Sequence, residues 1–548
     1  MTGVQTLPAA VREAAAQYAD HPAVVDGDTT LTFASLRQQV RDAARGYVAL
    51  GVRPGDRVAI WAPNTWHWIV AGLAVSHAGA TLVPLNTRYK GHEVIDVLDR
   101  TGATLAIIAD GFLGRSQVDE LQAAAGELRD AGDLGTEGEV VAGLPGLRAI
   151  VRISDDAAPG NPPGTVAFVD LASVGASVSD DQVDAIADAV TGDDIADILF
   201  TSGTTGRSKG VLSAHSQTIS ASAVWAATGQ VSDADRYLVI SPFFHSYGYK
   251  VGIVTSILTG CTLYPMAAFD AGEALRLIAD EQITMVPGAP TIFHSLLEHP
   301  DFATTDTSSL RFANTGAASV PVALVERMQS ELSFDLVITA FGMTECVTAT
   351  MCRPGDDDHT IATTCGRVVD GLELRIVDPE SGRVLGAGEE GEVQFRGPMV
   401  MRGYLDDPEA TAATIEPDGW LHTGDVGSVD ERGYLRITDR LKDMYISGGF
   451  NVYPAEVEQV LARLDGVVEA AVIGVPDERM GEVGKAHVVR RDGADVTVED
   501  VIAFAKERLA NFKVPRVVEF VDALPRNLGG KVLKTQLREQ HEPGKGQD

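Results

Sequence analysis

Between residues 30 and 110 the spacing of apolar and polar positions switches repeatedly between two patterns. Phe33–Leu50 has the spacing of an amphipathic helix, whereas Arg57–Trp61 and Thr81–Leu85 are short apolar runs of strand length. Helical segments that alternate with buried strands are typical of layered α/β folds. This part of the sequence therefore predicts an α/β architecture.

The following stretch, residues 110–192, is rich in Ala, Gly and Asp and has no clear period, so we predict an irregular, surface-biased region. The apolar run Ile195–Phe200 then leads into TSGTTGRSKG, Thr201–Gly210, and Ser216–Ala227 has a helical pattern. This order predicts a strand, a glycine-rich loop and a helix, an arrangement that offers backbone N–H groups to a phosphate.

The last part of the chain predicts a second, smaller domain. Further strand-like runs, separated by glycine-rich turns, are Glu373–Val377, Gly391–Arg396 and Tyr434–Ile437. A polar stretch with two adjacent glycines follows, and a new helical pattern begins at Pro454. We place the boundary there and predict a large domain at 1–440 and a small α+β domain at 441–548.

The composition is that of a folded soluble protein with more than one domain. The chain has 548 residues, of which 45% are hydrophobic and 22% are charged, and this length exceeds one ordinary core. Its formal net charge of -33 has the wrong sign for binding phosphate backbones, so we expect no nucleic-acid partner. Basic residues that bind anionic substrates must be gathered locally.

We expect a cytoplasmic protein without a membrane span. The N-terminus lacks the basic start and apolar core of a signal peptide. The most apolar stretch, 59–85, is interrupted at Pro63, Asn64, His67 and His77. It falls short of the ~20 apolar residues that a span needs. The cysteines suit a reducing compartment, because they form neither a disulfide framework nor a paired metal motif; they are Cys261, Cys346, Cys352 and Cys365.

The segment Thr201–Gly210 is the strongest chemical signal, because glycines allow close backbone approach, hydroxyls donate to phosphate oxygens and Lys209 adds a positive charge. It is not a Walker A loop, since Arg207 and Ser208 stand between the second glycine and the lysine. Its GRSKG part also matches the serine-hydrolase elbow, but Ser208 lies too far beyond the strand for that turn. The GAGEEG segment, 386–391, precedes a strand and is predicted to be a turn.

Several motifs together resemble the adenylate-forming superfamily, which includes acyl-CoA synthetases, peptide-synthetase adenylation domains and luciferases. They occur in the family's order over most of the chain and are Thr201–Gly210, FGMTE at 341–345, TGD at 423–425, DRLK at 439–442 and Pro525–Lys531. The resemblance implies a large N-terminal domain of layered α/β subdomains and a small mobile C-terminal α+β domain. It also implies ATP and CoA as co-substrates, Mg²⁺ as cofactor and an acyl-adenylate intermediate.

The resemblance also assigns roles to residues. The catalytic roles fall to Lys531, Thr201, Glu345 and His245. The contacts with nucleotide, phosphate and CoA fall to Ser202, Gly203, Thr204, Thr205, Gly206, Lys209, Gly316, Ala317, Phe341, Gly342, Thr344, Asp425, Arg440, Lys442, Gly448 and Gly449. Mg²⁺ is expected on Thr344 and Glu345, whose oxygen atoms suit a hard ion.

Each assignment has its own chemical reason. Phe341 would stack on adenine, where the family usually has a tyrosine, and Asp425 would accept both ribose hydroxyls. Lys531 would bridge carboxylate and phosphate oxygens during adenylation and be withdrawn afterwards as the small domain turns about Lys442. The two glycines at 448–449 would admit the pantetheine arm. His245 would gate the acyl pocket, although a lone histidine in an apolar stretch is more often a core residue.

A second resemblance narrows the range of carboxylic acids that could be the substrate. PNTWHWIVA, FFHSYGYK and the segment that follows Asp439 resemble actinobacterial acyl-CoA ligases of cholesterol ring degradation, which implies a hexahydroindanedione propanoate (HIP) as the small-molecule carboxylic acid. The main alternative is a medium- or long-chain fatty acid. A luciferase-like oxygenase, an amino-acid-activating module and a serine hydrolase using Ser208 are further alternatives. The oligomeric state, including a homo-oligomer, stays open.

Overall fold

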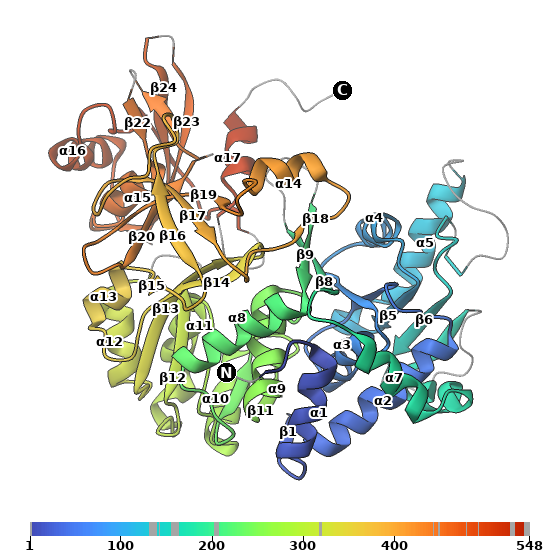
Figure 1. The fold of residues 1–548 in the computed structure, drawn as a ribbon. Helices are drawn as coiled ribbons and strands as arrows, with labels where there is room; N and C mark the ends of the chain where they lie inside the picture. Colours follow the sequence, from blue (N-terminus) through green and yellow to red (C-terminus); the bar gives the residue numbers. More distant parts are fainter. Residues whose placement is uncertain are drawn as a thin grey trace.

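A parallel-rich sheet with helices on both faces organises the N-terminal part of the protein (Figure 1). The computed structural model describes residues 3–130, 140–141, 143–154, 164–201, 208–316, 320–441, 443–447, 450–477, 479–491, 493–526 and 532–541. Within this range the strands of the sheet are β3 (Arg57–Trp61), β4 (Thr81–Pro84), β5 (Leu105–Ala109), β6 (Ala149–Ile153), β7 (Thr165–Ala167), β8 (Ile195–Thr201), β9 (Lys209–Ala214) and β18 (Gly403–Tyr404). Their order is β18-β9-β8-β4-β3-β5-β6-β7.

Side chains alternate between the two helix layers along each central strand. In β3, Val58 and Ile60 join one core cluster, whereas Ala59 and Trp61 join the other. The first cluster includes apolar side chains of α1 (Leu7–Gln17), α2 (Phe33–Ala49), α3 (Trp66–His77), α6 (Leu171–Val174) and α7 (Asp180–Ala189). The second includes those of α4 (Gly91–Thr101) and α5 (Gln117–Asp130). A strand buried on both faces reads as a continuous apolar run, which is the pattern seen in the sequence.

Two further groups of four strands lie beside this sheet and are joined through single bridges from Met285 to Tyr237 and to Phe312. The first group is β10 (Arg236–Val239), β11 (Thr262–Pro265), β1 (Pro22–Asp26) and β2 (Thr29–Thr32), and the second is β12 (Phe312–Gly316), β13 (Leu336–Met343), β14 (Cys346–Met351) and β15 (Arg367–Val368). The helices of this region are α8 (His215–Thr228), the π-helix η4 (Tyr247–Val254), α9 (Thr255–Thr259), α10 (Ala271–Asp280), α11 (Pro290–Glu298), α12 (Val322–Ser330) and α13 (Asp358–Thr363).

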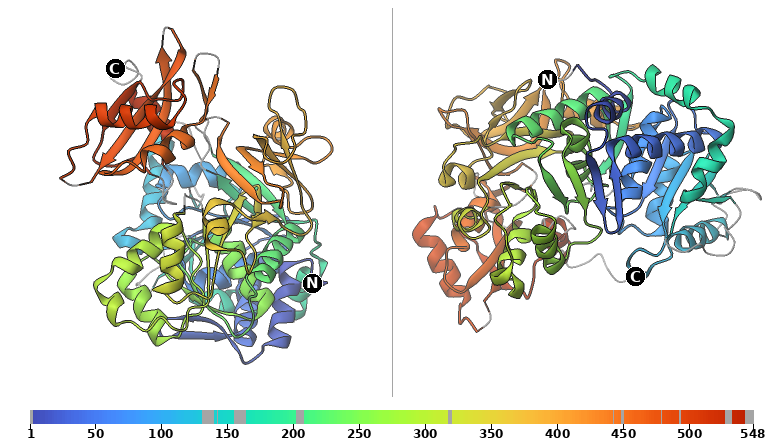
Figure 2. Two further views of the ribbon diagram at one scale, coloured as in Figure 1. Left: turned by 90° about the vertical axis from the view of Figure 1, so that its left-hand side faces the viewer. Right: turned by 90° about the horizontal axis from the view of Figure 1, so that it is seen from below.

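A smaller antiparallel sheet precedes the C-terminal part. It contains β16 (Glu373–Val377), β17 (Gly391–Arg396), β19 (Leu421–Val429) and β20 (Leu435–Arg440), with α14 (Pro408–Thr414) between β18 and β19. The C-terminal sheet follows with β21 (Tyr445–Ser447), β22 (Phe450–Val452), β23 (Val467–Asp477), β24 (Gly481–Arg490) and β25 (Val517–Phe520), and with α15 (Pro454–Leu461), α16 (Val498–Arg508) and α17 (Lys534–His541). The left view of Figure 2 shows the elements from β21 to α17 standing apart from the rest of the chain, whereas side chains of β16, β17, β19 and β20 belong to the first core cluster.

The α/β fold class with a large N-terminal and a small C-terminal part is confirmed, but one predicted region is wrong. Residues 110–192 are not uniformly irregular, because β6 lies inside the main sheet, between β5 and β7. The prediction rested on the overall richness of this region in Ala, Gly and Asp, and it therefore missed the short apolar run Ala149–Ile153. Among the residues that the structure describes, no helix is both long and apolar enough to cross a membrane.

Candidate active site

The segment TSGTTGRSKG joins two antiparallel strands. Thr201 at the end of β8 faces Lys209 at the start of β9, and its hydroxyl donates to the Lys209 carbonyl oxygen at 3.4 Å. The predicted order of strand, loop and helix is therefore wrong, because β9 intervenes and α8 begins only at His215. The predicted contacts at Ser202, Gly203, Thr204, Thr205 and Gly206 lie outside the described residues.

Arg100 of α4 holds the end of this loop, although no motif pointed to it. Its guanidinium donates to the Ser208 carbonyl oxygen at 2.8 Å and lies 3.5 Å from the Ser208 hydroxyl. The same group lies 4.9 Å from the centre of the Phe200 ring and pairs with Asp96 at 3.3 Å. The Ser208 hydroxyl thus faces an arginine, whereas a serine nucleophile needs an adjacent base.

Thr344 and Glu345 form the tip of the β13–β14 hairpin. Met343 and Cys346 pair directly across it, so the two residues between them make the turn. The Glu345 side chain is turned inward, and the residue is only 8% exposed. A buried carboxylate must be hydrogen-bonded, paired or coordinated, and this condition makes Glu345 the best placed of the predicted metal-binding residues.

The Glu345 carboxylate is held by Tyr404 of β18, another residue that no motif pointed to. The Tyr404 hydroxyl donates to Glu345 Oε1 at 2.8 Å, and the backbone N–H of Met401 donates to the Glu345 carbonyl oxygen at 2.8 Å. The Lys209 ammonium lies over the Tyr404 ring, 4.8 Å from its centre. Burial and the neighbouring Glu345 raise the pKa of the Tyr404 phenol, which stays protonated and able to donate.

Phe341 and Gly342 lie just before the tip, where the hairpin register is irregular. The Phe341 ring is half-buried and stacks against Phe395 with centres 6.0 Å apart. A Cβ atom on Gly342 would lie 1.9 Å from the Val347 carbonyl oxygen, so this position accepts only glycine without a backbone shift. The structure therefore gives a geometric reason for glycine in FGMTE.

Asp425 and Arg440 lie opposite each other on β19 and β20. Arg440 Nε is 2.8 Å from Asp425 Oδ1, and the Asp425 side chain is 3% exposed. The backbone N–H of Asp425 donates to the Thr423 hydroxyl at 3.0 Å, and that hydroxyl donates to the Val393 carbonyl oxygen at 2.7 Å. The TGD segment of β19 is thus fixed by its own threonine, and it presents a carboxylate already paired with the predicted arginine.

His245 lies two residues before η4 and is exposed. Desolvation by the surrounding protein lowers the pKa of its imidazole. Its exposure shows that it is not a core histidine. Asn64 fixes the preceding loop: its amide donates to the Ser241 carbonyl oxygen at 2.9 Å, and its oxygen accepts from the Phe243 N–H at 2.7 Å. In the sequence, PNTWHW was informative only through its resemblance to other ligases. The structure shows that its asparagine, Asn64, fixes the loop before His245.

The remaining predicted residues divide into two groups. Gly316 ends β12 and pairs with Ala340 of β13, directly before Phe341. Others lie outside the described residues, namely Ala317, Lys442, Gly448, Gly449 and Lys531. The structure therefore brings Lys209, Glu345 and Tyr404 into one contact network, and the assignments outside the described residues stay predictions.

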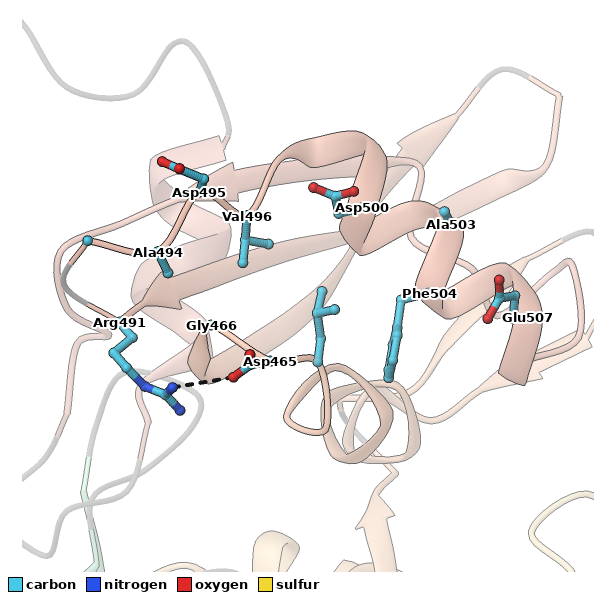
Figure 3. Close-up of a pocket in the computed structure, with 12 residues that line it drawn as sticks. Asp465, Gly466, Arg491, Ala494, Asp495, Val496, Asp500, Ala503, Phe504 and Glu507 are labelled. Carbon is cyan, nitrogen blue, oxygen red and sulfur yellow. Dashed lines mark hydrogen bonds and ion pairs between the residues drawn. The ribbon is translucent and has the colours of Figure 1, made fainter.

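A recess of about 600 Å³ lies in the C-terminal part, between α16 and the segments after α15 and β24. Figure 3 shows its acidic lining and the ion pair of Asp465 with Arg491, at 3.3 Å. Phe504 contributes an aromatic wall. The recess contains none of the predicted site residues, so it is separate from the candidate active site.

Comparison with protein families identifies the class of protein that this fold and site define. The AMP-binding enzyme family matches residues 11–405, and the AMP-binding enzyme C-terminal domain matches residues 456–531. The chain belongs to the AMP-binding enzymes. It also resembles the solved structure of ATP-bound MatB from Rhodopseudomonas palustris, with a TM-score of 0.83, 29% identity and coverage of 98% of this chain and 99% of that one.

Two curated relatives are considerably more similar. Both are named 3-[(3aS,4S,7aS)-7a-methyl-1,5-dioxo-octahydro-1H-inden-4-yl]propanoyl:CoA ligase. The protein of Rhodococcus jostii is 54% identical over 98% of this chain and 98% of its own length. That of Mycobacterium tuberculosis is 56% identical over 98% of this chain and 99% of its own length. The chain is thus similar to CoA ligases along nearly its whole length.

Proposed function

We propose that the protein is an AMP-forming ligase that joins the indanedione propanoate HIP to coenzyme A through an acyl-adenylate. The observation that carries this proposal is the identity of 54% and 56% with the two propanoyl:CoA ligases over 98% of the chain. The adenylation motifs recognised in the sequence agree with it. A fatty-acid substrate has less support, because both relatives are named for the bicyclic propanoate.

The chemistry demands positioning and charge neutralisation. A carboxylate oxygen of the acid attacks the α-phosphorus of ATP and pyrophosphate leaves; the thiol of CoA then displaces AMP from the acyl carbon. Two anions must meet in the first step, so fixed positive charge around the phosphates lowers its barrier. We assign this charge to Lys209 and Lys531, the nucleoside to Phe341 and Asp425, and the entrance of the acyl pocket to His245.

Mg²⁺ fits the donor set at the β13–β14 tip. Among the described residues, no cluster of three or more His, Cys, Asp or Glu side chains could hold a metal. A magnesium ion that relies on one carboxylate and on phosphate oxygens needs no such cluster. Glu345, with the Thr344 hydroxyl beside it, would hold the ion, which supplies charge neutralisation to the phosphates when bound.

We propose that the small domain begins at residue 441 and turns about Lys442. A hydrogen bond crosses this boundary, and an ion pair within the small domain holds the residue directly after Lys442. Asp439 Oδ2 accepts from the Ala455 N–H at the start of α15, at 2.7 Å, and Arg538 of α17 pairs with Asp443 at 2.9 Å. A turn of this domain would bring Lys531 to the carboxylate during adenylation and remove it for thioester formation.

The test is ATP- and CoA-dependent AMP release with HIP, octanoate, palmitate and benzoate. We expect AMP with HIP, and loss of adenylation in Lys531→Ala while thioester formation from preformed adenylate continues. The matched control is Lys506→Ala, which replaces an exposed lysine of α16. This variant should behave as wild type. Preference for palmitate would overturn the substrate, and ester hydrolysis without ATP would overturn the ligase assignment.

A further inference from the structure

We propose that Tyr404 is a positioning residue that holds Glu345 and Lys209 ready for the metal–nucleotide complex. The inference rests on the proposed function, since that function assigns Glu345 to the metal and Lys209 to phosphate. None of the recognised motifs contains Tyr404. The proposal comes from its contacts, which join the two oppositely charged groups through one side chain.

The backbone fixes Tyr404 relative to Lys209. In the β18–β9 ladder, Tyr404 pairs with Val211 and Gly403 pairs with Leu212. The Leu405 N–H donates to the carbonyl oxygen of Gly210, which follows Lys209, at 2.7 Å. Tyr404 itself is 9% exposed. Because β9 leaves the phosphate loop at Lys209, this ladder ties the aromatic ring to the loop's exit.

The hydroxyl fixes one oxygen of Glu345. Tyr404 donates to Oε1 at 2.8 Å, and the Met401 N–H anchors the Glu345 backbone at 2.8 Å from the same chain segment. A carboxylate bound through one oxygen keeps the other available and keeps its orientation. Partners that orient a metal ligand in this way strengthen metal binding, and their loss typically costs about 10- to 100-fold in affinity or activity.

The ring face holds the ammonium of Lys209. Its Nζ lies 4.8 Å from the ring centre, within the range of an attractive cation–π contact. Lys209 and Glu345 thus bind to different parts of the same side chain. Directly paired, they would neutralise each other; bound to Tyr404, each keeps its charge for the nucleotide or the ion.

Replacement of Tyr404 can separate these two contacts. Tyr404→Phe removes the hydroxyl and keeps the ring, so metal binding should weaken while metal-free ATP binding stays unchanged. Tyr404→Leu removes both, so ATP binding without metal should weaken as well. Thioester formation from preformed adenylate should remain unchanged in both variants, because neither contact serves that step.

The chain offers a matched control in Tyr434. Its hydroxyl donates to Asp356, and the guanidinium groups of Arg367 and Arg432 lie over its ring at 5.4 and 4.7 Å. Tyr434→Phe therefore removes the same kind of hydrogen bond beside the same kind of cation contact, outside the candidate site. It should leave metal and nucleotide binding unchanged.

The experiment is titration of the full-length protein with Mn²⁺, followed by electron paramagnetic resonance, with a non-cleavable ATP analogue present. We expect the Mn²⁺ dissociation constant of Tyr404→Phe to rise about tenfold and the Mg²⁺ needed for half-maximal pyrophosphate exchange to rise with it. Binding equal to that of wild type, or an equal loss in Tyr434→Phe, would overturn the inference. A wild type that binds Mn²⁺ and nucleotide but activates no acid would overturn the proposed function alone, and the Mn²⁺ series would still decide the role of Tyr404.

Discussion

The Nζ atom of Lys250 lies 2.9 Å from Oδ1 of Asp197, and both side chains are almost fully buried, at 2% and 0% exposure. Asp197 belongs to β8, which leads into the TSGTTGRSKG segment, and Lys250 belongs to η4, which follows His245. Asp197 Oδ2 also accepts from the Thr218 hydroxyl of α8 at 2.9 Å. One buried ion pair thus joins the strand before the loop to the helix behind the proposed acyl gate.

Lys250→Met should destabilise the protein by about 3–5 kcal/mol, because it leaves the Asp197 carboxylate buried without its cation. Denaturant unfolding measures the loss. A double variant, Asp197→Leu with Lys250→Met, should recover much of it, since removal of both charges is often neutral. Arg276→Met breaks an exposed ion pair with Glu273. It should leave the denaturant concentration at the midpoint of unfolding unchanged. A midpoint equally unchanged in Lys250→Met would contradict the ion-pair argument.

Asp425→Ala should raise the KM for ATP about 100-fold, in line with the loss of a buried, charge-assisted contact of roughly 3 kcal/mol. The control is Asp430→Ala in the same β19–β20 hairpin. Asp430 also pairs with an arginine, Arg432, at 3.0 Å, but it is partly exposed and outside the proposed nucleotide site. Steady-state kinetics with ATP varied distinguishes the two variants. Equal KM values for both would remove Asp425 from the nucleotide site.

Much of the fold could be predicted wherever apolar runs were bounded by clear turns. Arg57–Trp61, Glu373–Val377 and Gly391–Arg396 were predicted with the bounds that β3, β16 and β17 have. The helix predicted at Ser216–Ala227 differs from α8 by one residue at each end. In these places local pattern and tertiary environment agree, because buried strands are continuously apolar and helix ends carry recognisable signals.

The rest depended on partners distant in sequence. The segment Lys209–Ala214 is short and mixes polar and apolar residues, and it becomes β9 only because β8 and β18 pair with it on either side. Tyr404 and Arg100 serve the site through contacts with residues far along the chain, Glu345 and Ser208. A motif shows residues close in sequence and cannot show such pairs. Strand pairing and burial supplied this missing information.

Stability should fall as the pH is lowered from about 6.5 to about 4. Burial lowers the pKa of both His77 and His215 to about 4 from the ordinary 6.5. In this window the unfolded chain takes up protons that the folded protein does not, so folding is progressively disfavoured, by about 3 kcal/mol per histidine at the lower limit. Desolvation raises the pKa values of buried Asp439 and half-buried Glu458, and these two groups act with the opposite sign.

Because these groups have opposite effects on stability, the pH dependence of the melting temperature is compared between wild type and His77→Gln. The measured quantity is the difference between the two slopes of melting temperature against pH. Thermal unfolding from pH 7 to pH 5 should show a shallower pH dependence in this variant. His92→Gln, at an exposed histidine paired with Glu127, should retain the wild-type slope. Equal slopes in all three proteins would refute the assignment to His77.

The native protein should resist thiol reagents. Burial raises the pKa of Cys261, Cys346 and Cys365 to about 12 and also raises that of Cys352. Only the thiolate reacts, so its fraction at pH 8 is negligible in the folded state. A colorimetric thiol assay should detect no rapid reaction before denaturation and four thiols after it, the number in the sequence. Rapid reaction of the native protein would show that one of these thiols is accessible.

Gly342→Ala should damage nucleotide activation without unfolding the protein as a whole. A Cβ atom there would meet the Val347 carbonyl oxygen at 1.9 Å, and the backbone shift needed to relieve this overlap would displace the turn that carries Glu345. Gly126→Ala in α5 is the control, since a Cβ atom there meets nothing within 4 Å and alanine should add about 0.5–1 kcal/mol of helix stability. ATP–pyrophosphate exchange and thermal unfolding measure the two effects. Full exchange activity in Gly342→Ala would mean that the hairpin tip tolerates displacement, and the steric argument for Glu345 would fail.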